Sequence, residues 1–128
     1  MLRLMQWASS AILIGCLSAI ASAESSVVTY YGYDDCIEIR SADTRVILCP
    51  AAGGRVLYYG THQENLLYLP AGDEGWRWDG KSGRAPMTAG RFDIGPEKMV
   101  PKRPTLWQGK WHGETKGELT AVMTSQPD

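Results

Sequence analysis

The stretch CIEIRSADTRVILC, residues 36–49, predicts a β-hairpin. Its first half alternates apolar with charged side chains, its second half is rich in aliphatic and β-branched residues, and SADT between them supplies the turn. A four-residue loop places Arg40 opposite Arg45 and, at the open end, Cys36 opposite Cys49. The same register lays four apolar side chains on one face, namely Ile37, Ile39, Val46 and Leu48.

Short apolar segments on both sides of this hairpin predict more strands. Before it, VVTYYGY at 27–33 is β-branched and aromatic, and two aspartates separate it from the hairpin. After it, Gly53 and Gly54 can take the positive φ angles of a tight reversal. No segment beyond residue 23 has a helical pattern, so the expected fold class is all-β, an antiparallel β-sandwich. Further strands are expected at 55–59, 65–69, 105–111 and 118–124, with a turn at 113–117.

The first residues have the pattern of a secretory signal peptide. Arg3 is followed by an apolar run at 8–20 that is too short to cross a bilayer, and ASA at 21–23 is a small-x-small cleavage site. Removal of residues 1–23 leaves residues 24–128 as a single β-domain. Because the chain stops one hairpin short of anything that covers its last strand, we expect this domain to be truncated at its C-terminus.

A lipoprotein signal is the alternative at the same end of the chain. LIGC at 13–16 has the form of a bacterial lipoprotein box, which would leave a lipid anchor on Cys16. Both routes export the chain, so the expected location is periplasmic or extracellular. Neither route leaves a membrane span after cleavage.

The cysteines and histidines limit the chemistry that the sequence can support. In an exported protein, the facing Cys36 and Cys49 are expected to form a disulfide, with two small buried side chains as the alternative. Neither has a histidine nearby in sequence or a helix start to lower its pKa, so a catalytic thiol is not expected. His62 and His112 are too isolated for a metal site. We therefore predict no metal and no cofactor.

The charge balance and the aromatic residues bear on partners. The chain has 13 Lys and Arg against 14 Asp and Glu, a net charge of −1, whereas nucleic-acid binders need a clear basic excess. Five Trp and six Tyr against one Phe offer amphipathic surface. These features argue against nucleic acid and favour a neutral polar ligand.

Charged and aromatic residues are concentrated in GRFDIGPEKMVPKRPTLWQGKW, residues 90–111. Asp93 and Glu97 can act as an acid and base pair at a glycosidic or hemiacetal centre, or they pair with neighbouring cations. Arg91 can hold ring hydroxyls or a carboxylate through its fork of donors, or it anchors a loop. No spacing in this stretch matches a nucleophile with its base, so it predicts a site without a reaction.

Two tryptophans complete this stretch. Trp107 and Trp111 are four residues apart, which places them on one face of the strand expected at 105–111. From there they either stack on a sugar ring or pack into the sandwich core.

A phosphate-loop pattern, GWRWDGKS at 75–82, also occurs in the chain. Such a loop needs a helix that begins at its lysine, because the helix amides bind the phosphate. Gly83 and Pro86 follow Lys81 and oppose a helix, so nucleotide binding is not expected. Trp76 and Trp78 are then loop aromatics.

Two segments resemble a known family. ILCPAAGGRV at 47–56 followed by ENLLY at 64–68 resembles the opening of galactose mutarotase-like domains, in the aldose epimerase superfamily. AGRFDIGPE at 89–97 and WQGKW at 107–111 are similar to an uncharacterised secreted bacterial branch of it. The resemblance implies the N-terminal portion of a larger antiparallel supersandwich that binds carbohydrate, with a histidine and a glutamate as acid and base. No motif here carries either role, so we assign no catalytic residue and do not expect this fragment to be an active epimerase.

Two functions follow. The first is an exported carbohydrate-binding or carbohydrate-processing β-sandwich of galactose mutarotase type. The second is a non-enzymatic envelope β-domain with a structural or interaction role. The ligand-binding candidates for the first are Arg91, Asp93, Glu97, Trp107 and Trp111.

Overall fold

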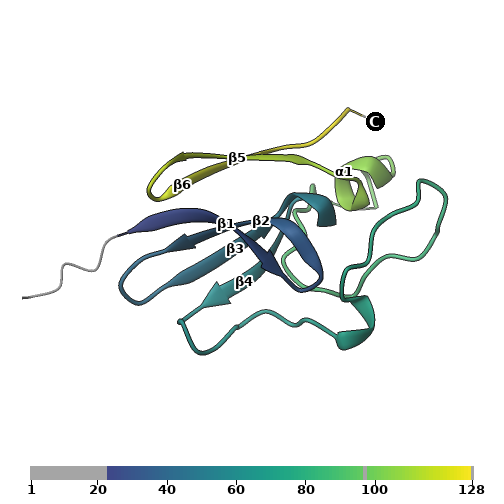
Figure 1. Ribbon diagram of the computed structural model, residues 1–128. Coiled ribbons are helices and arrows are strands. Elements are labelled where there is room, and N and C mark those ends of the chain that lie inside the picture. The colour runs from purple at the N-terminus through teal and green to yellow at the C-terminus, as the bar shows by residue number, and fades with distance from the viewer. Residues whose placement is uncertain (1–22, 97, 128) are drawn as a thin grey trace, which may run out of the picture.

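The computed structural model describes residues 23–96 and 98–127 and contains two antiparallel sheets (Figure 1). The four-stranded sheet follows chain order and consists of β1 (Glu24–Tyr30), β2 (Tyr33–Arg40), β3 (Arg45–Cys49) and β4 (Arg55–Gly60). The second sheet is a hairpin of β5 (His112–Gly117) and β6 (Thr120–Thr124). The helical elements are the short η1 (Pro50–Ala52), η2 (Ala71–Asp73) and α1 (Pro104–Gln108). The predicted all-β antiparallel class is confirmed.

The β2–β3 hairpin has the register that the sequence predicts. Arg40 lies opposite Arg45, and the pairing continues inward to Ile37 opposite Leu48. The turn is closed by a hydrogen bond from the Ser41 N–H to the Thr44 carbonyl at 2.9 Å. His62 Nε2 lies 3.1 and 3.0 Å from the carbonyls of Ser41 and Ala42, so it donates to the same turn. This histidine therefore stabilises the hairpin.

Both faces of the four-stranded sheet are covered. Successive residues of a strand point to opposite faces, so the cysteines and the predicted apolar set lie on different sides. The apolar set faces β5–β6: a Cβ on Gly113 would lie 2.6 Å from Pro50 Cγ and 3.0 Å from Ile37 Cδ1. Figure 1 shows that hairpin lying across one side of the sheet. The main core is on the cysteine side and comprises Tyr33, Cys36, Ile47, Cys49, Ala51, Ala52, Leu57 and Tyr58.

The two cysteines differ from the disulfide prediction. Cys36 and Cys49 are both fully buried and carry free thiols. Their side chains are hydrogen-bonded to each other, and Cys36 Sγ also donates to the Tyr30 carbonyl at 3.8 Å. The bond from Cys49 lowers the pKa of the Cys36 thiol, whereas the same bond and burial raise the pKa of the Cys49 thiol. In this structure the pair is packed as two small core side chains, the alternative given by the sequence.

The strand expected at 27–33 is divided by a tight turn. Tyr31 and Gly32 both have positive φ, 47° and 76°, and Tyr30 pairs with Tyr33 across them. Positive φ at both central residues is typical of a two-residue hairpin turn. The chain therefore reverses before the two aspartates, which are part of β2.

Three other predictions for the local structure are wrong. Residues 65–69 form only a single bridge, between Gly60 and Asn65. The strand expected at 105–111 is instead the helix α1, which begins with a proline at its first position, where no backbone donor is needed. The turn expected at 113–117 lies within β5, because Gly113 fits against the sheet where a side chain would not.

Asn65 closes the outer edge of β4. Its Oδ1 accepts from the N–H groups of Tyr59 and Leu67, both at 3.1 Å, and its Nδ2 donates to the Leu57 carbonyl at 2.9 Å. The Leu66 N–H donates to the Tyr59 carbonyl at 3.0 Å. One amide side chain thus supplies partners that a neighbouring strand would otherwise supply.

Candidate functional site

The position of α1 depends on the turn after η1. Gly53 and Gly54 have φ angles of 69° and 64°, as the sequence predicts for a tight reversal. A Cβ on Gly54 would lie 2.5 Å from Trp111 Cδ2, so the indole packs directly on the backbone of the turn. The Trp111 N–H donates to the Pro50 carbonyl at 2.8 Å, and its Nε1 donates to the Leu106 carbonyl at 2.9 Å. These contacts fasten α1 to the end of β3.

Trp111 is consequently a packing residue. It is 9% exposed, and the ring of Phe92 meets it edge-on with centroids 6.3 Å apart. It does not share a strand face with Trp107, because Trp107 belongs to α1 and Trp111 follows it. The prediction that the two tryptophans share one strand face is therefore wrong, and Trp111 packs against the glycine turn, in line with the second alternative that the sequence gives.

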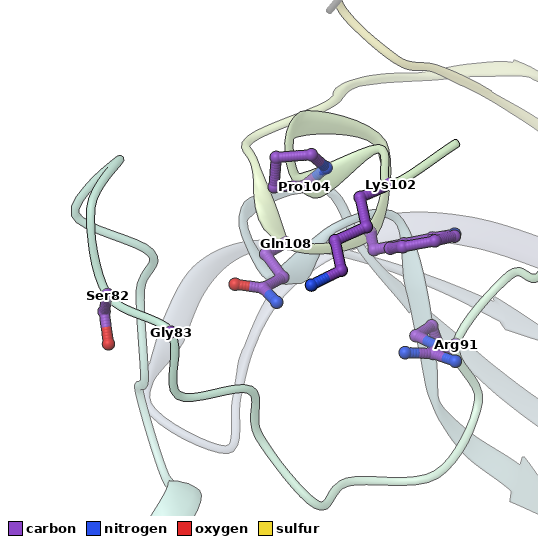
Figure 2. Close-up of a pocket in the computed structure, with 7 residues that line it drawn as sticks. Ser82, Gly83, Arg91, Lys102, Pro104 and Gln108 are labelled. Atoms are coloured by element: carbon purple, nitrogen blue, oxygen red, sulfur yellow. The ribbon is translucent and has the colours of Figure 1, made fainter.

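A pocket of about 360 Å³ lies beside α1. Figure 2 shows Lys102 and Gln108 extending toward one open space, with the loop of Ser82 and Gly83 facing them and Arg91 at its far side. Three segments between residues 82 and 108 thus meet here. The lining residues are Ser82, Gly83, Arg91, Lys102, Pro104, Trp107 and Gln108.

Arg91 is held in place at this pocket. Its guanidinium lies 5.4 Å from the centroid of the Trp107 ring, and it forms an ion pair with Asp93 at 2.9 Å. Asp93 is thus paired with a cation, which is one of its two predicted roles. Glu97 lies outside the described residues, so the predicted acid and base pair stays a prediction.

Two polar atoms of the lining side chains are buried without a partner among the described residues. They are Trp107 Nε1, a donor, and Gln108 Oε1, an acceptor. Trp107 as a whole is only 8% exposed. A buried polar group without a hydrogen bond costs on the order of 1–3 kcal/mol, so these two atoms are unsatisfied positions on residues that line the pocket.

The wall opposite α1 is a loop anchored from within. Asp73 is buried, accepts a hydrogen bond from the Met87 N–H at 2.6 Å and forms an ion pair with Arg84. Ser82 and Gly83 lie between these anchor points. The buried carboxylate therefore fixes the base of the loop whose tip lines the pocket.

A second arginine lies near Arg91 in the interior. Arg55 is 2% exposed, and its Nη1 donates to the Thr88 carbonyl at 2.7 Å, while its Nε has no hydrogen-bond partner in the described chain. Burial lowers the pKa of Arg55, and the charge of Arg91 lowers that pKa further. The two guanidinium groups are thus close enough to repel each other.

The phosphate-loop pattern does not form a phosphate site. None of the helices within residues 23–96 begins at Lys81. The Asp79 carboxylate accepts hydrogen bonds from the N–H groups of Lys81 and Ser82, at 2.9 and 2.6 Å, and these bonds lower the pKa of Asp79. The amides that would bind a phosphate are already occupied by a side chain of the same loop.

Sequence reasoning identified part of this pocket. Arg91 and Trp107 were candidates and both line it, whereas Lys102 and Gln108 were not. Both missed residues lie in or beside the segment expected to be a strand. The sequence signal for this helix is Pro104, because proline is favoured at the first position of a helix. A helix from Pro104 brings Trp107 and Gln108 to the pocket, which a strand does not.

The described residues contain no group of three His, Cys, Asp or Glu side chains that could hold a metal ion. No helix within residues 23–96 or 98–127 is long and apolar enough to cross a membrane.

No family model matches the chain, and neither a curated protein nor a solved structure matches it. The resemblance to galactose mutarotase-like domains therefore rests on the sequence motifs alone.

Proposed function

We propose that this chain is an exported β-domain that binds carbohydrate in the pocket beside α1. The observation that carries the proposal is the convergence of an indole, two cations, an amide and a hydroxyl on a space of about 360 Å³. Small-molecule sites typically enclose about 300–1,000 Å³ and combine an apolar wall with a few placed polar groups. The buried Trp107 Nε1 and Gln108 Oε1 support a ligand with several hydroxyls.

The proposal includes kinship with the galactose mutarotase-like sandwiches, of which this chain would be an N-terminal portion. This kinship is supported by the position of the shared Gly-Gly-Arg motif, which contacts residues of the site. The Gly-Gly-Arg turn at 53–55 packs against Trp111, and the charge of its Arg55 interacts with that of Arg91. The lining side chains offer charge, hydrogen bonds and an aromatic wall, which are features of binding, and we assign no catalytic residue.

Calorimetric titration of the purified protein with a panel of monosaccharides and oligosaccharides tests the proposal. We expect saturable binding, weakened about tenfold by Gln108→Ala, which corresponds to about 1.4 kcal/mol. Lys98→Ala is the control, because Lys98 is exposed and does not line the pocket. A folded protein that binds no sugar, or that binds equally well with Gln108→Ala, would contradict the proposal.

An interaction role for an envelope domain is the second candidate. Tyr59 and Leu66 are 53% and 68% exposed, adjoin through a backbone hydrogen bond and line a shallow hollow beside β4. Exposed apolar side chains that adjoin in this way favour a protein contact. This candidate would be favoured if the folded protein binds no sugar and if Leu66→Ser reduces its self-association relative to the native sequence.

A further inference from the structure

The charge of the pocket beside α1 indicates more than a polar ligand. Arg91 and Lys102 line it, and the other described lining residues are neutral. Asp93 pairs with Arg91, so the charge of Lys102 is the local excess at the pocket, in a chain whose net charge is −1. Such a pocket attracts an anion even when the whole protein is near neutral.

The two cations are arranged differently. Arg91 is oriented by its contact with Trp107 and its ion pair with Asp93, so little ordering is needed before it binds. Lys102 is exposed and forms no hydrogen bond or ion pair with the residues that the structure describes. The guanidinium of Arg91 is therefore a planar donor that is held in place, whereas the ammonium of Lys102 is a point charge on a flexible stem.

Arg55 adds positive charge behind the pocket. It is fully buried, and the charge of Arg91 lowers its pKa, whereas Asp93 and Asp73 raise that pKa. An anion bound at Arg91 would add to the partial offset of this repulsion that Asp93 already supplies.

The aromatic wall is also better suited to a charged sugar than to a neutral one. Neutral sugars stack on open indole faces, but the Arg91 guanidinium lies over the Trp107 ring. The buried donor on Trp107 and the buried acceptor on Gln108 still require hydroxyl partners. The pocket thus combines sites for one anionic group with sites for sugar hydroxyls.

We infer that the ligand of this pocket is an acidic saccharide, whose anionic group binds between Arg91 and Lys102 while its hydroxyls reach Gln108 and Trp107. The inference rests on the proposed carbohydrate-binding function and specifies its ligand class. The anionic group is the carboxylate of a uronic acid, and a sulfate ester on a sugar offers the same chemistry.

Calorimetry with matched pairs of ligands tests the inference: galacturonate against galactose, glucuronate against glucose, and galactose 6-sulfate as the ester. We expect the acidic member of each pair to bind at least about tenfold more tightly, because charge-assisted hydrogen bonds are roughly twice as strong as neutral ones. Added salt should reduce this preference. Tighter binding of the sulfate ester than of the uronates would support the inference with the ester as the source of the anion.

Charge reversal of Lys102 supplies the matched variant. Lys102→Glu should weaken uronate binding about tenfold or more, and it should weaken the binding of the matched neutral sugars much less. Lys98→Glu alters the net charge equally at an exposed site outside the pocket and should change neither. Both side chains are exposed, so neither substitution removes a packing contact.

Three results would overturn the inference. Neutral sugars that bind as tightly as acidic ones, with both weakened by Gln108→Ala, would leave the carbohydrate site standing and remove its acidic preference. Acetate or sulfate that competes at the same concentration as a uronate would indicate a simple anion site. Folded protein that binds none of these ligands would remove both proposals.

Discussion

The packing of Trp111 depends on Gly54. Its φ of 64° lies in the left-handed region, and a Cβ would come within 2.6 Å of two carbons of the indole. Gly54→Ala should therefore lower the free energy of unfolding by about 2–4 kcal/mol, from the backbone conformation and from overpacking. Urea denaturation followed by circular dichroism measures this change.

Gly72→Ala is the matched control. A Cβ at Gly72 would meet nothing within 4 Å. Its effect should stay within about 0.5 kcal/mol, as for most surface substitutions. Equal stability of the Gly54 and Gly72 variants would show that Trp111 does not depend on the turn.

Tyr33 should make stability depend on pH in the alkaline range. Burial raises its pKa from 10.0 to about 12, and its hydroxyl donates to the Trp76 carbonyl. The folded state thus holds the proton more tightly than the unfolded state. The resulting stability is fully present below pH 10, is lost as the pH rises toward 12, and amounts to about 2 kcal/mol.

Urea denaturation at several alkaline pH values checks this prediction. The free energy of unfolding should fall more steeply from pH 10 to 12 in the native sequence than in Tyr33→Phe. Some decline should remain in the variant, because burial also raises the pKa of Tyr30 and of Tyr31. Parallel pH profiles would exclude Tyr33 as the cause.

At the scale of elements, the β2–β3 hairpin could be predicted and α1 could not. Alternation and turn length are local properties, and they specify the pairing of Arg40 with Arg45 down to Ile37 with Leu48. A five-residue helix has little stability of its own and depends on tertiary contacts, here those of Trp111 with the glycine turn. The pocket was only partly predicted for the same reason.

The burial of the two cysteines in the same hairpin predicts how their thiols react. Cys36 and Cys49 are both 0% exposed, and the Cys36 bond and burial raise the pKa of the Cys49 thiol. Both should resist iodoacetamide in the native protein and react once urea unfolds it, without reductant. Peptide mass spectrometry of the alkylated chain measures this.

The opposite result has a defined meaning. If neither cysteine reacts after unfolding until reductant is added, the protein holds the disulfide that the sequence predicts. Reduction should then lower the melting temperature, since closing this short loop is worth about 3 kcal/mol in the chain-entropy model.

At the scale of the whole molecule, stability depends on the contact between the two sheets. Gly113 allows β5 to approach Pro50 and Ile37, and Met123 Sδ lies 3.1 Å from the position of its missing Cβ. Gly113→Val should destabilise the protein by about 1–3 kcal/mol through overpacking. It should also expose residues 112–124 to limited proteolysis before the four-stranded sheet is cleaved.

Thr115→Val tests the same strand without the clash. Thr115 is exposed, so this substitution should change stability by no more than about 0.5 kcal/mol. If Gly113→Val were equally harmless, the two sheets would have to be joined by other contacts.

The pairing of Asn65 with β4 makes the two outer margins of the four-stranded sheet different. On that margin the Asn65 side chain already pairs with Leu57 and Tyr59 of β4, whereas within the described chain no backbone–backbone hydrogen bond from another segment reaches the outer margin of β1. A further strand would therefore compete with fewer existing hydrogen bonds beside β1 than beside β4.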